Sequence, residues 1–187
     1  MKTFHEFDQY YKDLDISTSN MGAVMADLDP KNIQKILDVI DDSDCYTDPK
    51  LPFVQGKVGA KPHMTVKYGI LKGVKTEFIE AIYKGEDLGS VDCKAISCFS
   101  NAKDVYDVLI LKVDPTGNIK KLNELAAFAP NVDTFVPYVP HVTLAYLKKG
   151  KLKDYKDLMD GKWNIKMKVT ELNYSPYGVK ESFKLKI

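Results

Sequence analysis

The sequence contains no arginine, and all 27 of its basic residues are lysines. Any site that binds an anion must therefore use ammonium groups, hydroxyls, imidazoles or backbone N–H groups instead of the two-pronged guanidinium group. The lysines are balanced by 26 acidic residues, which gives a net charge of +1. Without a large positive excess the chain lacks the usual basis for bulk binding of duplex nucleic acid, whereas a small nucleotide ligand stays open.

Long hydrophobic runs are also missing. The mean hydropathy is -0.27, and no apolar stretch is long enough to span a bilayer. The opening residues Met1-Lys2-Thr3-Phe4 lead into a charged segment without the apolar core of a secretory signal. We therefore expect a cytoplasmic protein with no membrane partner, whose 187 residues suffice for one domain with a sizeable core.

Cysteine and histidine are scarce, at three residues each. Cys45, Cys93 and Cys98 are odd in number, and their spacing to the histidines fits no common zinc pattern. We expect reduced cysteines in core or strand positions, with no metal and no other cofactor. The acidic run 41–44 directly follows a predicted helix, which favours a solvated loop over a cation site.

Strand-like and helix-like segments alternate along the chain, and the order of the first half recurs in the second. Each half predicts strand, helix, strand, helix, strand. We therefore expect one α+β domain over 1–187, with lobes at about 21–99 and 105–187, an N-terminal extension at 1–20 and a long loop at 41–61. The predicted strands are 22–26, 62–71, 91–99, 105–113, 138–147, 163–172 and 182–187, and the predicted helices open at Pro30, at Thr76 as a cap, near Ile119 and near Leu152.

A repeated motif lies at equivalent places in the two halves. Pro62–Tyr68 reads PHMTVKY and Pro140–Tyr146 reads PHVTLAY, which share the pattern Pro-His-apolar-Thr-apolar-x-Tyr. All four identical positions are offset by the same 78 residues. A chance match of this kind is improbable, so the pair predicts a site that is built twice.

Strand geometry predicts how the motif side chains are arranged. Successive side chains of a strand point to opposite faces, so His63 and Thr65 share one face, and His141 and Thr143 do the same. If a pseudo-twofold axis relates the halves, two imidazoles and two hydroxyls meet in a shared cleft. One isolated His-x-Thr is usually structural, but the matched pair favours catalysis or substrate binding. His5 lies outside the repeat and is expected at the surface.

These four groups suit a phosphodiester substrate. Histidine titrates near neutral pH, so one imidazole can take a proton from water or a ribose 2′-hydroxyl while the other protonates the leaving oxygen. Threonine hydroxyls can donate hydrogen bonds to the non-bridging phosphate oxygens. No metal is needed for this chemistry.

The two His-x-Thr motifs, each on an apolar strand, resemble those of the 2H phosphoesterase superfamily, also called LigT-like or 2′-5′ RNA ligase-like. The resemblance runs from about Met21 to Ile187 and includes the closing segment Val169–Ser175 with the turn at Pro176-Tyr177-Gly178. It implies a bilobal α+β fold with a central cleft. It also implies metal-independent cleavage of 2′,3′-cyclic phosphates, of 2′-5′ or 3′-5′ linkages at RNA ends or in oligonucleotides, or of cyclic dinucleotides. The catalytic positions it implies are His63, Thr65, His141 and Thr143.

The composition adds a further resemblance. The arginine-free, lysine-rich chain with its Met-Lys-Thr-Phe start is similar to bacteriophage members of the superfamily. Some phage members degrade the cyclic oligonucleotide messengers of bacterial CBASS immunity, which implies such messengers as one substrate class and the host cytoplasm as the place of action. Many members also hold an arginine near the phosphate. Here Lys67, which shares strand parity with His63, or a loop lysine such as Lys57 or Lys61 would have to replace it.

Aromatic residues near the motifs are candidates for stacking on a nucleobase, because every base has a π-face. For each of them a place in the core is the simpler alternative. The tyrosines that end both motifs, Tyr68 and Tyr146, fall on the face opposite the histidines in an ideal strand, which predicts core packing. The stacking candidates are Phe53 in the long loop, Tyr138 before the second motif, and Tyr174 and Tyr177 near the C-terminal turn.

Three functions are compatible with these features. A metal-independent phosphodiesterase uses both imidazoles, because acid–base chemistry needs a proton acceptor and a proton donor. A nucleotide-binding or messenger-sequestering protein could keep the same cleft without turnover. A metallohydrolase is less well supported, since two histidines without suitably spaced acids or cysteines make a poor ligand set. The sequence leaves the exact substrate and the oligomeric state open.

Overall fold

The computed structural model describes residues 21–50, 54–57, 61–100, 103–133, 137–179 and 181–187. Strands and helices alternate in the predicted order, which confirms an α+β fold whose two halves each run strand, helix, strand, helix, strand. The strands are β1 (Gly22–Leu28), β2 (His63–Ile70), β3 (Ser90–Phe99), β4 (Tyr106–Val113), β5 (His141–Lys148), β6 (Ile165–Ser175) and β7 (Phe183–Lys184). The helices are α2 (Gln34–Val39), α3 (Thr76–Tyr83), α4 (Asn118–Ala126) and α5 (Lys156–Asp160), with 3-10 helices η2 (Pro30–Asn32), η3 (Asp42–Asp44) and η4 (Lys151–Tyr155).

The helix starts show where local sequence signals hold and where they do not. Asp29 caps η2 by accepting a hydrogen bond from the Lys31 N–H at 3.0 Å, and Pro30 occupies the first turn as expected. Thr76 was expected to cap the next helix, but it is the first residue of α3. Lys75 is the N-cap there and makes no side-chain capping hydrogen bond.

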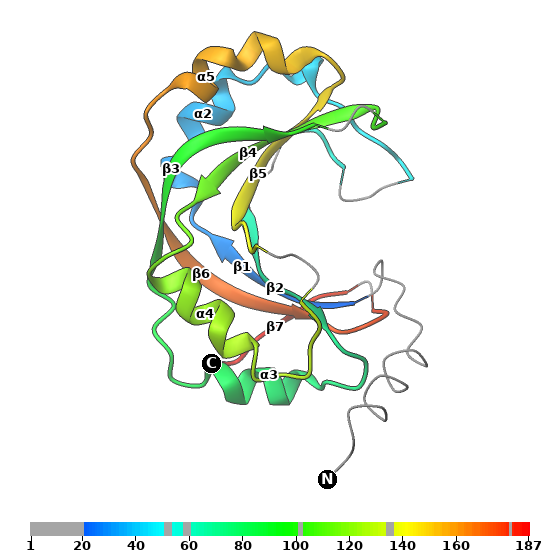
Figure 1. Ribbon diagram of the computed structural model, residues 1–187, viewed down its shortest axis with the longest axis vertical. Helices are drawn as coiled ribbons and strands as arrows, with labels where there is room; N and C mark the ends of the chain where they lie inside the picture. The colour runs from blue at the N-terminus through cyan, green and yellow to red at the C-terminus, as the bar shows by residue number, and fades with distance from the viewer. Residues whose placement is uncertain (1–20, 51–53, 58–60, 101–102, 134–136, 180) are drawn as a thin grey trace.

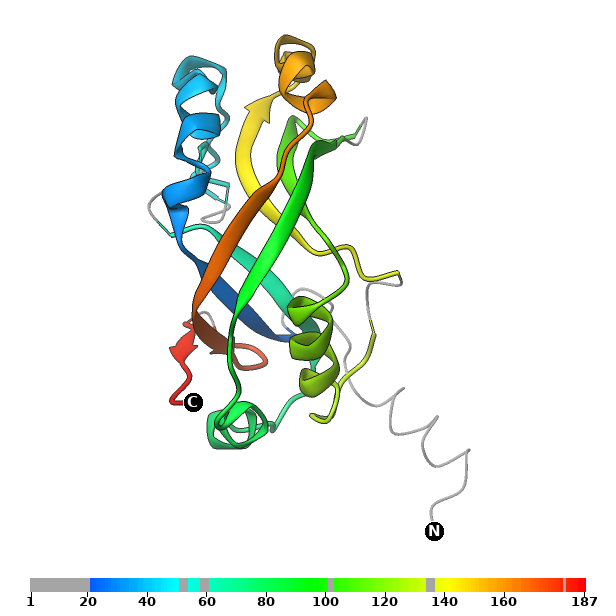
Figure 2. The same ribbon diagram turned by 90° about the vertical axis from the view of Figure 1, so that its left-hand side faces the viewer.

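The seven strands form one antiparallel sheet in the order β1-β2-β5-β4-β3-β6-β7, with an additional pairing of β1 with β6. β6 is long enough to serve two neighbours, because its residues 165–168 pair with β3 and its residues 169–175 pair with β1. Figure 2 shows β6 running beside β3 before it reaches β1. Strands of the sequence halves 21–99 and 105–187 therefore pair with each other, since β1 pairs with β6 and β3 pairs with β4 and β6.

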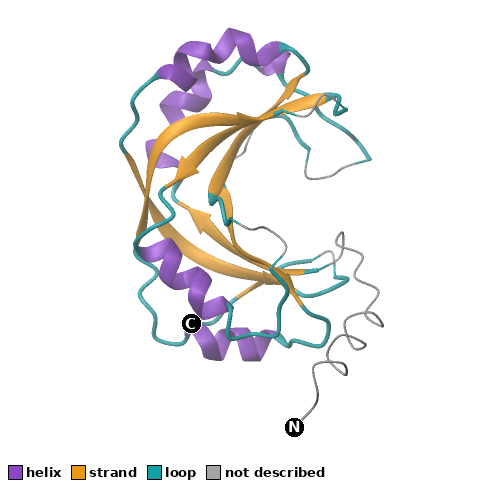
Figure 3. Cartoon of the chain, in the orientation of Figure 1, coloured by secondary structure: helices purple, strands orange, loops and turns teal. Residues whose placement is uncertain are grey.

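The sheet is strongly curved, and the helices lie on its outer, convex side (Figures 1 and 3). The core lies between the sheet and these helices, and it includes Met64, Val66, Val142 and Leu144, each 1% exposed or less. Because side chains alternate along a strand, the residues between these four face the other, concave side. Among the described residues, no helix has the length and apolar character needed to cross a membrane.

The cysteines and the acidic run lie away from the concave side. Cys45, Cys93 and Cys98 are free thiols, and burial raises the pKa of Cys93 to about 12. In the acidic run, Asp42 forms an ion pair with Lys57, and Asp44 accepts hydrogen bonds from Lys151 and Tyr155. Within the described part of the chain, no group of three or more histidine, cysteine, aspartate or glutamate side chains gathers as a metal site would require.

Candidate active site

A single residue pair joins the two motif strands. β2 and β5 pair only at Met64 and Val142, whose side chains are buried on the helix side of the sheet. Extending this antiparallel register by one residue places His63 across from Thr143 and Thr65 across from His141. The four side chains share the concave face, where His63 is exposed and the other three are partly exposed. Residues in such positions have Cβ atoms about 4.5–8 Å apart, which is close enough for one small group to touch all four.

The proline before each histidine anchors its strand in the same way. The carbonyl of Pro62 accepts a hydrogen bond from the N–H of Leu28 in β1 at 2.9 Å. The carbonyl of Pro140 accepts one from the N–H of Val113 in β4 at 3.1 Å. Proline lacks an N–H and suits the start of a strand, where its carbonyl can still join the ladder. The shared proline therefore fixes where each histidine enters the sheet.

A β-bulge follows the threonine in the first motif. Thr65 pairs with Met25 of β1, but Lys67 pairs with Val24, so Val66 is an extra residue in β2. The carbonyl of Val66 accepts a hydrogen bond from the side-chain amide of Asn123 at 2.6 Å. A bulge of this kind reverses the alternation of the residues that follow it.

The second motif contains a bulge at the equivalent residue. Thr143 pairs with Ile110 of β4, but Ala145 pairs with Leu109, so Leu144 is the extra residue in β5. Leu144 is offset from Val66 by the 78 residues that separate the motifs. The internal repeat therefore extends to an irregularity of the backbone.

Because of the bulges, both motif tyrosines lie on the concave face. Tyr68 pairs with Ala23, and Tyr146 pairs with Val108 of β4. Both tyrosines are partly exposed, and the side chain of Tyr146 lies near that of Thr143. The expectation that these rings pack in the core is thus not met, because it assumed unbroken alternation.

The bulge also turns Lys67 away from the site. It lies opposite the fully buried Val24, is itself 5% exposed, and forms an ion pair with Asp133. Lys57 is likewise committed elsewhere, to the carbonyl of Ile40 at 2.9 Å and to the carboxylate of Asp42 at 2.8 Å. Neither lysine therefore faces the motif residues, although parity had favoured Lys67.

A different lysine lies next to a motif histidine. Lys112 of β4 is exposed and pairs directly with His141, which puts its ammonium group on the concave face. In the sequence, Lys112 stands out as a charged residue inside the apolar run 105–113. The run itself does not show that β5 is the strand that pairs with it.

His141 is held in one orientation. Its Nδ1 lies 2.9 Å from the carbonyl oxygen of Val139, and a carbonyl can only accept, so Nδ1 carries the hydrogen. In the neutral ring, Nε2 is then the nitrogen with the free lone pair. The edge of the ring contacts Phe99 of β3, with centroids 4.9 Å apart and planes at 84°.

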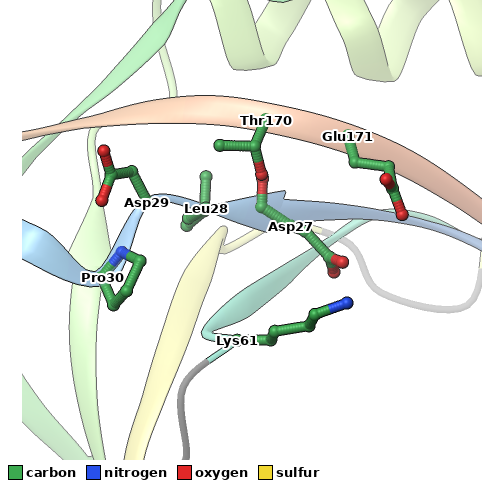
Figure 4. Close-up of a pocket in the computed structure, with 7 residues that line it drawn as sticks. All are labelled: Asp27, Leu28, Asp29, Pro30, Lys61, Thr170 and Glu171. Atoms are coloured by element: carbon green, nitrogen blue, oxygen red, sulfur yellow. The ribbon is translucent and has the colours of Figure 1, made fainter.

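An acidic pocket adjoins His63. Asp27 of β1 pairs with His63 on one side and with Glu171 of β6 on the other, so all three share the concave face. A third bulge, at Thr170, interrupts β6 at this point. Figure 4 shows the carboxylates of Asp27 and Glu171 and the ammonium of Lys61 extending in the same direction. The pocket has a volume of about 280 Å³ and is lined by Asp27, Leu28, Asp29, Pro30, Lys61, Thr170 and Glu171.

Of the described stacking candidates, Tyr138 contacts a motif strand and Tyr174 lies in the core. Tyr174 is fully buried, and its hydroxyl donates to the carbonyl of Val74 at 3.1 Å; burial raises its pKa to about 12. Tyr138 donates to the carbonyl of Thr65 at 2.6 Å and so supports the motif strand through its backbone. Tyr177 lies partly buried in the turn after β6, and Phe53 lies outside the described residues.

The arrangement can therefore hold a small anion between two imidazoles and two hydroxyls, with Lys112 on one side and Lys61 on the other. The imidazoles, the hydroxyls and the two lysines together suit a phosphate group that carries organic substituents on both sides. Pairing across strands determines this arrangement, which explains why Lys112 was not predicted from the sequence, whereas Lys61 was among the candidates.

Solved structures with the same architecture include Kluyveromyces marxianus Usb1, which is 12% identical with a TM-score of 0.54, over 91% of this chain and 99% of that one. Usb1 with uridine monophosphate is 13% identical, with a TM-score of 0.52 over 91% of this chain and 100% of that one. Escherichia coli LigT complexed with 3′-AMP is 14% identical, with a TM-score of 0.52 over 89% and 95%. The chain has the 2H phosphoesterase fold. No family model and no curated protein sequence matches it.

Proposed function

We propose that this protein belongs to the 2H phosphoesterases and cleaves a nucleotide phosphodiester without a metal ion. The Met64–Val142 pair carries the proposal, because it brings His63, Thr65, His141 and Thr143 to neighbouring positions on one exposed face. The fold shared with Usb1 and LigT supports it, as do the uridine monophosphate and 3′-AMP in structures of those proteins.

In the proposed reaction, a water molecule or a ribose 2′-hydroxyl attacks the phosphorus. We assign the base role to His141, because the Val139 carbonyl holds its Nδ1 hydrogen and leaves the Nε2 lone pair to accept the proton. His63 then gives a proton to the leaving oxygen as the P–O bond breaks. The hydroxyls of Thr65 and Thr143 donate hydrogen bonds to the non-bridging oxygens, where negative charge grows in the transition state.

The substrate classes to test follow from this chemistry. They are 2′,3′-cyclic nucleotides, 2′-5′ and 3′-5′ oligonucleotides as models of RNA ends, and cyclic di- and trinucleotides, which include the messenger class that phage proteins would degrade. All offer a phosphodiester between two organic groups. The acidic groups beside His63 disfavour a second phosphate in that pocket, because like charges repel.

The experiment compares the wild-type protein with the double variant His63→Ala, His141→Ala across this panel in the presence of EDTA, with products separated and identified. The variant His5→Ala is the matched control, because His5 is the third histidine of the sequence and lies outside both motifs. We expect cleavage by the wild type and by the control, and none by the double variant.

Three results would contradict the proposal. Full activity in the double variant would remove the two-histidine mechanism. Tight binding of a panel member without cleavage by the wild type would instead favour a sequestering protein that uses the same face. Dependence on a divalent cation would favour the metallohydrolase alternative.

A further inference from the structure

Phe99 lies exposed beside the second motif. Its side chain at the end of β3 is 44% exposed, and its ring contacts His141 edge-on. Phe99 pairs with Val108 of β4, and Val108 pairs with Tyr146 of β5. These three residues therefore form a row on the concave face, and the ring of Phe99 at one end of the row contacts His141. An exposed aromatic ring next to a polar site offers a flat apolar surface on which a ligand can stack.

Three tyrosines continue this aromatic surface. The rings of Tyr146 and Tyr106 lie 5.5 Å apart and nearly perpendicular, and the rings of Tyr106 and Tyr46 are stacked at 5.5 Å. The N–H of Tyr46 donates to the carbonyl of Tyr146 at 2.8 Å, which holds the loop residue against β5. All three are partly exposed. We call these residues and Phe99 the aromatic wall.

The aromatic wall lies next to Thr143, whose hydroxyl we assign to phosphate binding. The bulge at Leu144 puts Tyr146 on the same face as Thr143, and the two side chains lie near each other. Burial, with a smaller contribution from Tyr106, raises the pKa of Tyr146, so its phenol stays neutral at physiological pH. A ligand whose phosphate lies at Thr143 would therefore extend its attached group over neutral aromatic rings.

The two sides of the site differ in chemistry. Beside His63 the neighbouring strands present the carboxylates of Asp27 and Glu171. Beside His141 they present the ammonium group of Lys112, and the ring of Phe99 from the aromatic wall contacts His141. A flat, uncharged heterocycle gains from stacking on rings, and it gains nothing comparable from carboxylates. The carboxylates on one side and the aromatic wall on the other therefore give the substrate a fixed direction across the sheet.

We propose that the aromatic wall is a nucleobase subsite, in which Phe99 stacks on the base of the nucleotide whose phosphate lies between His63 and His141. The inference rests on the proposed function for the position of the phosphate. It adds the recognised group and its side of the site, and it assigns substrate specificity to residues of β3, β4 and the loop before β2.

The test uses 2-aminopurine riboside 3′-monophosphate, a nucleotide whose fluorescence falls when its base stacks. We compare the wild type with Phe99→Ala, with the conservative variant Phe99→Tyr, and with Phe78→Ala. Phe78 is a matched control because it is 47% exposed but lies on α3, on the convex side of the sheet. Ribose 5-phosphate, which has no base, is the second ligand.

We expect Phe99→Ala to raise the Kd of the aminopurine nucleotide about 5-fold to 150-fold, the range that corresponds to loss of one base–aromatic stack. Phe99→Tyr should keep wild-type affinity and quenching, and Phe78→Ala should change neither. The affinity for ribose 5-phosphate should be the same in all four proteins, because that ligand has no base to stack.

Three outcomes would overturn the subsite. They are wild-type quenching in Phe99→Ala, no quenching by the wild-type protein, and an equal loss of affinity for ribose 5-phosphate, which would mean that Phe99 only supports His141. Failure of the proposed function looks different. If quenching depends on Phe99 but no substrate is cleaved, the nucleobase subsite stands and the proposed catalysis is wrong. If substrates are cleaved but neither quenching nor affinity depends on Phe99, the proposed catalysis stands and the subsite is wrong.

Discussion

Replacing Thr143 by valine removes one hydroxyl from the site and little else. Valine has the same branched shape and suits a strand, so β5 should keep its pairing of residue 143 with Ile110. If the hydroxyl donates to a phosphate oxygen, its loss should lower kcat/KM about 100-fold to 1000-fold, the effect of removing one such donor in other enzymes.

Thr143 has a second neighbour, Tyr146, so the loss of a phosphate donor has to be distinguished from the loss of this contact. The side chain of Thr143 also lies near the phenol of Tyr146 and acts to lower the pKa of that group. The variant Tyr146→Phe removes this neighbouring hydroxyl and leaves Thr143 in place. The rate loss in Thr143→Val should therefore exceed the loss in Tyr146→Phe by about tenfold or more, because only the first removes a phosphate donor.

The assay is single-turnover cleavage of the best substrate in EDTA, with thermal unfolding of each variant measured alongside. Thr143→Ser should recover much of the rate, since serine restores the hydroxyl. Thr65→Val is the matched change in the first motif and should cost a similar factor, because Thr65 is the equivalent residue beside the same central pair. Wild-type rates in both valine variants would refute the reasoning.

Three further predictions concern residues outside the proposed chemistry. Lys67→Met should leave kcat/KM and nucleotide affinity unchanged, since the Lys67 ammonium is paired with Asp133, and weaker nucleotide binding would contradict its position. Burial alone would raise the pKa of Asp107, but hydrogen bonds from Lys149, Ser100 and the Gly150 N–H together lower it. The stability that the Asp107 carboxylate contributes is therefore present at neutral pH and lost as the pH falls below about 4. Urea unfolding should show Asp107→Asn to be less stable than the wild type by about 1–3 kcal/mol at pH 7, and by less at pH 3. The same difference in stability at both pH values would argue against this. Tyr174→Phe should cost about 1 kcal/mol of unfolding free energy in the same assay without changing nucleotide affinity, since its hydroxyl donates to the carbonyl of Val74, away from the motif residues.

Sequence patterns were sufficient for the order of elements and for the residues that share the central face. Both follow from local rules, namely helical spacing, strand alternation and a repeat with a constant offset. The alternation rule holds from His63 to Val66 and then fails at Lys67 and Tyr68. One extra residue in a ladder reverses every later side chain, and nothing in the composition of PHMTVKY marks where it occurs.

The sequence did not show which aromatic residue lies exposed beside the motifs, for a related reason. Tyr174 and Phe99 are both aromatic strand residues, yet one is fully buried and the other is 44% exposed. The difference lies in the partner strand, since Tyr174 pairs with the core residue Val24 and Phe99 pairs with Val108 on the concave face. Sequence proximity to a motif is a poor guide when the neighbours come from strands far away in the chain.

The course of β6 has a consequence for how the protein folds. β1 needs β6 as a partner, and β3 is held between β4 and β6, so strands early in the chain stay incomplete until residues 165–175 arrive. Contacts between such distant segments slow folding, because the loop between them must close before any pairing stabilises it. The sheet should then form and unfold as one cooperative unit, and fragments cut between β3 and β4 should not fold alone.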